Sequence, residues 1–137
     1  ININTNGTFF KHRELCKLVD GFLYHCSEDL EDELIIPDFI PIEKLEFMLV
    51  ISDNNFHRLD SYISKYPDIK FLVSGADSRT VTGVDVVGLS ISNGIKVSKE
   101  FRGRLSPDSY INLIMKCQDL NIKRGLNALR WKNTIMN

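Results

Sequence analysis

Three histidines, His12, His25 and His57, are the side chains best suited to acid–base or metal chemistry near neutral pH. None has a Cys, Asp or Glu at the spacing that places metal ligands on a shared helical face. The sequence also lacks the Walker, G-x-G-x-x-G, G-x-S-x-G and H-E-x-x-H motifs. We therefore predict no catalytic residue, no metal site and no cofactor, and we prefer a binding module to an enzyme.

The three cysteines, Cys16, Cys26 and Cys117, are an odd number without C-x-x-C spacing. Neither a disulfide framework nor a zinc ribbon is indicated, so a reducing compartment is the simpler interpretation. No nearby residue is placed to lower a thiol pKa. We expect these side chains to pack in the core.

Basic side chains alternate along one predicted strand and its exit, which makes them candidates for binding phosphates. The segment reads KVSKEFRGR and carries one aromatic ring, that of Phe101, between the charges. The phosphate candidates are Lys96, Lys99, Arg102 and Arg104. An acidic run, SEDLEDE at residues 27–33, has no glycine of the kind that a Ca²⁺ loop requires, so we interpret it as a solvated face.

The formal net charge of −1 hides a division along the chain. Residues 1–92 carry 8 basic and 15 acidic side chains, a net charge of −7, and residues 93–137 carry 9 and 3, a net charge of +6. Two explanations stay open at this point. The basic last third meets an anionic partner or the acidic part of another subunit, or the two parts of the chain pair with each other.

Hydrophobic spacing predicts the elements that would position these residues. Apolar residues at intervals of three and four predict a helix over Lys11–His25, and two prolines make Leu34–Ile42 an extended edge segment. Leu45–Ser52 has the pattern of a buried strand. Asp53 would then cap a helix over Asn54–Tyr66, before a second strand at Ile69–Val73.

The second half of the chain begins with residues 74–92, whose β-branched residues favour a strand. The spacing of the apolar residues in this stretch does not distinguish a strand from a helix. Asn93-Gly94 predicts a hairpin turn, with a return strand over Ile95–Arg102. Ser106 is the expected N-cap of a helix over Pro107–Asp119. The core-facing residues predicted in that helix are Tyr110, Ile111, Ile114, Met115 and Cys117. A last helical piece is expected at Leu126–Met136.

The length of 137 residues, with 43% hydrophobic and 26% charged residues, is typical of one globular domain over residues 1–137. No apolar run approaches the roughly 20 residues that span a bilayer. No basic and then apolar leader opens the sequence. We predict no membrane partner.

Several short sequence pieces occur in the order and spacing of one known family. They are NGTFFK (Asn6–Lys11), FMLV (Phe47–Val50), FLVSGAD (Phe71–Asp77), EFRGRL (Glu100–Leu105) and RLSPDSYINLIMKCQD (Arg104–Asp119). Together these pieces make the chain resemble the cap-binding domain of the influenza-type polymerase basic protein 2, an orthomyxovirus polymerase subunit. A divergent thogotovirus member is the branch that fits best.

The resemblance implies an α+β fold, in which a mixed or antiparallel β-sheet packs against a small set of helices. It implies a cleft in which two aromatic rings sandwich the methylated guanine of an mRNA cap, a carboxylate reads its base edge and polar residues hold the phosphates. This is the cap-snatching step of viral transcription. The implied partners are the other subunits and domains of the polymerase heterotrimer and RNA, in the host cell nucleus and the virion.

Counting along the chain places the family's cap-contacting positions on residues that lack the required rings and carboxylate. They are Ile3, Pro41, Leu45, Ile91, Ser106 and Ser109, and Glu46 lies next to the carboxylate position. Rings that a shifted alignment would bring into the site belong to Phe39, Phe47, His57 and Phe101. Because stacking on a ring contributes about 1–3 kcal/mol per base, we expect cap binding to be weak or absent.

The leading hypothesis is therefore a non-catalytic, cap-binding-like domain with a degenerate site. A bacterial toxin-immunity protein is the alternative, in which the acidic face at residues 27–33 blocks a basic nuclease. A long reading frame on both sides of this segment would favour the polymerase subunit, and a short frame beside a toxin gene would favour immunity.

Overall fold

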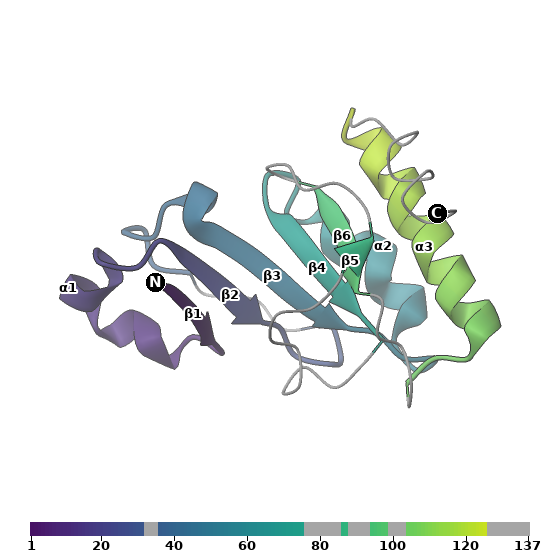
Figure 1. Cartoon of the computed structure of the whole chain (residues 1–137), viewed down its shortest axis with the longest axis horizontal. Coiled ribbons are helices and arrows are strands. Elements are labelled where there is room, and N and C mark those ends of the chain that lie inside the picture. The colour runs from purple at the N-terminus through teal and green to yellow at the C-terminus, as the bar shows by residue number, and fades with distance from the viewer. Residues whose placement is uncertain (32–35, 76–85, 88–93, 99–103, 126–137) are drawn as a thin grey trace.

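A computed structural model describes residues 1–31, 36–75, 86–87, 94–98 and 104–125, and within these ranges a six-stranded sheet is the central element (Figure 1). The strands are β1 (Asn2–Thr5), β2 (Gly21–His25), β3 (Leu45–Val50), β4 (Lys70–Ser74), β5 (Val86–Val87) and β6 (Ile95–Ser98). Their order across the sheet is β1-β2-β3-β4-β6-β5. The neighbouring strands β1, β2, β3, β4 and β6 are parallel to one another. The two-residue strand β5 is antiparallel to β6.

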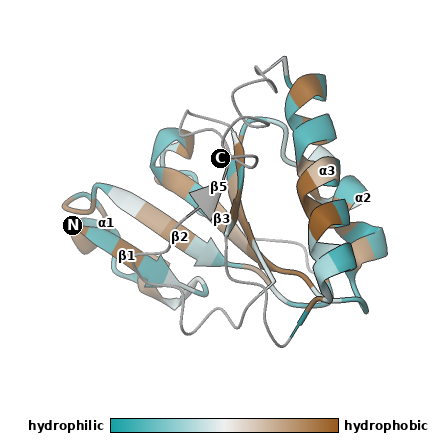
Figure 2. Cartoon of the chain, turned by 45° about the vertical axis from the view of Figure 1, so that its right-hand side comes forward, coloured by the Kyte–Doolittle hydropathy of each residue, from teal (hydrophilic) through white to brown (hydrophobic). Residues whose placement is uncertain are grey.

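Helices α2 and α3 lie side by side against one face of this sheet, and α1 lies at the other end, beside β1 (Figure 2). The α-helices are α1 (Arg13–Cys16), α2 (Leu59–Ser64) and α3 (Pro107–Lys123), and the 3₁₀ helices are η1 (Thr8–Lys11), η2 (Ile42–Lys44) and η3 (Phe56–Arg58). Buried side chains of α2 and α3 belong to the same core cluster as those of β3, β4 and β6. An ion pair between Lys116 of α3 and Asp60 of α2, at 2.8 Å, also joins the two helices.

Alternation along the strands gives the sheet two different faces. On the helix-covered face, Tyr24, Phe47 and Phe71 stand side by side in register, with ring centroids 5.6 and 5.7 Å apart. On the opposite face, which we call the second face, the register row of Leu23, Glu46 and Lys70 is mostly polar. The apolar core therefore lies between the sheet and the helices.

The strand direction corrects the expected architecture. The combination of a sheet with helices is confirmed, but the prediction of a mixed or antiparallel sheet is wrong for the five main strands, which are all parallel. Strands β2, β3, β4 and β6 begin 24, 25 and 25 residues apart. Connections of this length allow the chain to return to the same end of the sheet, which parallel pairing requires.

The helix predicted over Lys11–His25 is wrong beyond its beginning. Helix α1 covers only Arg13–Cys16, and Gly21–His25 forms β2 between β1 and β3. The apolar residues fit a helical period, but Asp20 and Gly21 favour a break, and the aromatic side chains that follow fit a pleated surface. Tertiary pairing on both sides of β2 decided the outcome.

Two strand predictions and one cap are confirmed. Strand β3 lies within the predicted Leu45–Ser52, and β4 overlaps the predicted Ile69–Val73 and ends one residue later, at Ser74. The hydroxyl of Ser106 accepts a hydrogen bond from the Ser109 backbone N–H at 3.2 Å, so it caps α3 as expected. Of the predicted return strand after Gly94, the described part forms β6.

Other local predictions are wrong. Asp53 does not cap a helix, because α2 begins only at Leu59 and no side-chain cap precedes it. The described part of the proline segment contains turns and η2, with no strand. In α3, Ile111 and Met115 are 56% and 61% exposed instead of core-facing.

Some predictions fall outside the described residues. These are the conformation of most of residues 74–92, the turn at Asn93, and the helix at Leu126–Met136. Among the residues that are described, no helix is both long and apolar enough to cross a membrane.

Asn121 of α3 holds the end of β6 by both halves of its side-chain amide. Its Oδ1 accepts from the Ile95 N–H at 2.9 Å, and its Nδ2 donates to the Ile95 carbonyl at 3.0 Å. The side chain is fully buried. We expect Asn121→Ala to lower the free energy of unfolding by about 2 kcal/mol, because it leaves two buried backbone groups without partners.

Urea denaturation of the variant and of Asn112→Ala, an exposed asparagine on the same helix, measures this effect. Equal midpoints for the two variants would contradict the role given to Asn121.

Candidate functional site

The rings proposed for cap binding do not come together in the structure. Phe47 is 1% exposed, and Tyr24, Tyr66 and Phe71 surround its ring in the core. Phe39 is half-buried, with the guanidinium carbon of Arg13 5.1 Å from its ring centroid. Phe47 therefore has no face free for a base.

Neither of the other two ring candidates is shown to form a sandwich with Phe39 or Phe47. His57 is exposed in η3, and no ring contact joins it to Phe39 or Phe47 within the described chain. Phe101 lies outside the described residues.

The family positions that lack rings lie at unrelated places. Ile3 packs against the core from β1, and Leu45 is buried at the start of β3. Pro41 is exposed just before η2. At the start of α3, the hydroxyls of Ser106 and Ser109 are 3.0 Å apart and bonded to each other. Ile91 falls outside the described residues.

Glu46 lies on the second face, because side chains alternate along β3 while Leu45 enters the core. Its carboxylate oxygen Oε2 is 2.9 Å from Nζ of Lys96, one of the predicted phosphate candidates. Lys70 is its register neighbour on β4. Lys44 and Lys70 line a pocket of about 270 Å³ with it.

We call Glu46, Lys44, Lys70 and Lys96 the Glu46 cluster. A carboxylate among ammonium groups can accept hydrogen bonds from a base edge while a lysine holds a phosphate. The described strand residues of the second face include no Phe, Tyr or Trp. The cluster therefore has the polar part of a nucleotide site and no stacking platform.

Sequence reasoning found Glu46 and Lys96 separately but missed Lys44 and Lys70. The alternation of β3 and β4 would have indicated Lys70, once these strands were known to be parallel neighbours in this register.

Three ion pairs connect the basic last third of the chain to its acidic part. Lys96 pairs with Glu46, and Lys116 pairs with Asp60. Arg104 donates two hydrogen bonds to the carboxylate of Glu28, at 3.1 and 3.3 Å. Pairing between the two parts of the chain is thus confirmed for these side chains, and it reduces the charge that Lys96 and Arg104 can offer to a phosphate. Lys99 and Arg102 lie outside the described residues.

The cysteines are buried, as expected. Burial raises the pKa of the Cys16 and Cys117 thiols and raises that of Cys26 to about 12. All three are free thiols, and thiols with such pKa values stay protonated near pH 7. Across the described ranges, no group of three metal-ligating side chains comes together.

Comparisons with known proteins add no relative: no family model matches the chain, and neither does any curated protein or solved structure.

Proposed function

We propose that this chain is a cap-binding-like domain of an orthomyxovirus-type polymerase basic protein 2, with no catalysis of its own and a degenerate cap site. The observation that carries the proposal is the collinear series of sequence pieces between Asn6 and Asp119. The parallel sheet is not the arrangement that the resemblance implies, so the proposal depends on these pieces and not on the fold.

Several of these sequence pieces coincide with the ends of strands or the beginning of a helix, as the resemblance implies. The FMLV piece ends β3, which leads to α2, and the FLVS piece forms the end of β4. The SPDSY piece begins α3 at Ser106. These agreements support the proposal at the level of strand and helix order.

A degenerate cap site has separate support. Leu45 and Phe47 point into the core, and the neighbouring carboxylate, Glu46, lies on a face without a Phe, Tyr or Trp in the described strands. A single carboxylate without stacking partners does not select a methylated base, because the charge of 7-methylguanine is recognised through aromatic faces. The domain would then contact other polymerase domains and RNA in the host cell nucleus.

The immunity alternative has weaker support. It needs an acidic face that is free to meet a basic nuclease. Instead, the carboxylate of Glu28 is bonded to Arg104, and that of Glu31 lies 2.6 Å from a nitrogen of Arg58. Two of the five carboxylates of this acidic run are therefore paired within the chain, and Asp32 and Glu33 lie outside the described residues.

Titration calorimetry with 7-methyl-GTP and with GTP tests the degenerate site. Since two stacking faces together contribute roughly 2–6 kcal/mol, we expect dissociation constants in the millimolar range and less than about twofold preference for the methylated base. Micromolar binding of 7-methyl-GTP that Phe39→Ala or His57→Ala abolishes would overturn this part of the proposal.

Sequencing the gene around this segment tests the assignment itself. A long frame that continues on both sides as a polymerase subunit is expected. A short complete frame beside a toxin gene would contradict the polymerase assignment and favour the immunity alternative.

A further inference from the structure

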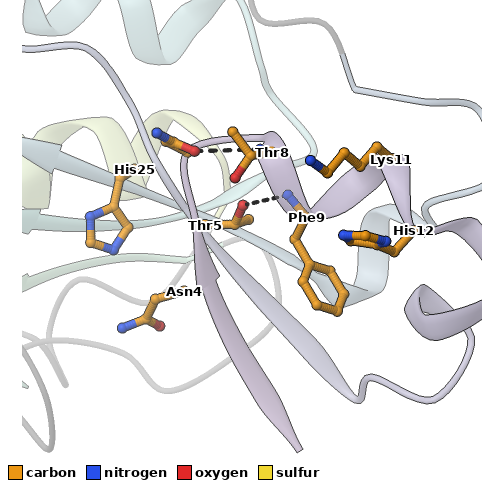
Figure 3. A pocket seen from close by; sticks show the side chains of 8 residues that line it. Asn4, Thr5, Thr8, Phe9, Lys11, His12 and His25 are labelled. Carbon is orange, nitrogen blue, oxygen red and sulfur yellow. Dashed lines mark hydrogen bonds between the residues drawn. The ribbon is translucent and has the colours of Figure 1, made fainter.

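A second pocket, of about 490 Å³, lies where β1 and β2 end, next to η1 (Figure 3). In parallel sheets, ligands bind preferentially outside the carboxyl ends of the strands. Lys11 and His12 border the pocket on one side, and His25 and Asn4 border it on the other (Figure 3). The pocket is large enough for a small nucleotide or a sugar phosphate.

The floor of this pocket is fixed by local hydrogen bonds. The hydroxyl of Thr5 accepts from the backbone N–H groups of Gly7 and Phe9, at 3.0 and 3.4 Å. The side-chain carbonyl of Asn6 accepts from the Thr8 N–H at 3.4 Å. Because these polar groups already have backbone partners, the side chains left for a ligand are mainly basic.

The charge of the lining is one-sided. It includes the ammonium group of Lys11 and the imidazoles of His12 and His25, the last of them uncharged, and it includes no carboxylate. Elsewhere in the described chain, many cations pair with carboxylates: Lys17, Arg58, Lys96, Arg104, Lys116 and Lys123. Lys11 does not belong to this paired set, so its charge remains available to an anion.

One ring nitrogen of His25 lacks a hydrogen-bond partner among the described residues. Its Nε2 is buried and has no hydrogen-bond partner in the described part of the structure. Burial also lowers its pKa, so the ring is neutral at pH 7. A buried polar atom without a partner costs about 1–3 kcal/mol, and a turn of the imidazole ring toward the adjoining pocket would let a ligand oxygen remove that cost.

We propose that this pocket binds a phosphate group, held by the ammonium of Lys11 and the imidazoles of His12 and His25. Phosphate oxygens accept several hydrogen bonds and carry the negative charge that this lining lacks. Asn4 and Thr8 add polar groups that can orient the rest of the ligand. The phosphate belongs to a small phosphorylated molecule or to an RNA backbone, and the inference does not depend on the polymerase assignment.

NMR titration of the whole 137-residue chain tests this site, with the imidazole Cε1–H signals of His12 and His25 as reporters. The two probes are inorganic phosphate and an eight-nucleotide single-stranded RNA. We expect phosphate to shift both signals, and Lys11→Gln to raise its dissociation constant by about tenfold, as loss of a charge-assisted hydrogen bond predicts. His12→Gln should weaken binding severalfold.

Lys65→Gln, on the exposed end of α2, is the matched control and should leave the dissociation constant within about twofold, since exposed charges interact weakly over long distances. Stronger binding of the RNA, also weakened by Lys11→Gln, would support the site and identify a backbone phosphate as its ligand. Binding of inorganic phosphate alone would support the site and identify a small ligand. Unshifted histidine signals with both probes, or shifts that Lys11→Gln leaves unchanged, would overturn the proposal.

Discussion

Phe47→Ala is expected to lower the free energy of unfolding by about 3–5 kcal/mol, the range measured for removing a buried phenylalanine ring. The ring lies 5.2 to 5.7 Å from the rings of Tyr24, Tyr66 and Phe71, so it joins the middle of the sheet to the segment that follows α2. Such a loss is a large fraction of the stability of a typical domain. Urea denaturation followed by circular dichroism measures it.

Phe39→Ala is the matched control, because this phenylalanine is half-buried and its charged neighbour, Arg13, is a surface residue. We expect it to cost about 1 kcal/mol, in keeping with its partial burial. If Phe47→Ala folded as stably as the control while losing nucleotide binding, Phe47 would belong to a ligand site and its place in the core would be wrong.

Asn55→Ala is expected to lower the free energy of unfolding by about 3 kcal/mol, which makes it the second largest effect. The amide of Asn55 donates to the carbonyls of Glu28 and Val50, at 2.6 and 2.8 Å, and its oxygen accepts from the Ser52 N–H at 2.9 Å. One buried side chain thereby connects the segments that follow β2 and β3. Alanine would leave all three backbone groups without this partner.

The neighbouring Asn54 provides the control for this experiment. Its side chain is exposed, and the hydrogen bond from its backbone N–H to the Ser52 hydroxyl, at 3.3 Å, survives in Asn54→Ala. We expect this variant to unfold within about 0.5 kcal/mol of the parent chain, as surface substitutions commonly do. A comparable loss in both variants would show that the turn, and not the Asn55 amide, connects the two strands.

The ion pairs explain part of the charge difference between residues 1–92 and residues 93–137. A chain with opposite charge in its two parts can attract a partner or satisfy itself, and Glu46–Lys96, Glu28–Arg104 and Asp60–Lys116 show that part of the charge is used internally. Arg124 likewise donates to the backbone carbonyls of Ile69 and Tyr66, at 2.6 and 3.0 Å. Among the described residues, Lys11, which lies in the acidic part of the chain, is a cation outside these pairs and borders a pocket without a carboxylate.

Local sequence signals determined β3, β4 and the beginning of α3. A run of apolar residues is sufficient for a buried strand, and the Ser106 hydroxyl reaches a backbone N–H only three residues away. The absence of a catalytic motif is likewise read directly from the sequence. These features depend on groups that are close together along the chain.

Only the tertiary structure decided the direction of the strands, the strand at Gly21–His25 and the face on which Glu46 lies. Each depends on partners far away in the sequence: Arg104 meets Glu28 across 76 residues, and the pocket beside η1 needs both Lys11 and His25. The apolar residues between Lys11 and His25 fit a helical period, and yet Gly21–His25 forms a strand. Hydrogen bonding to β1 and β3 stabilises the strand. Because these partners are far away in the sequence, the local pattern of residues does not reveal this stabilisation.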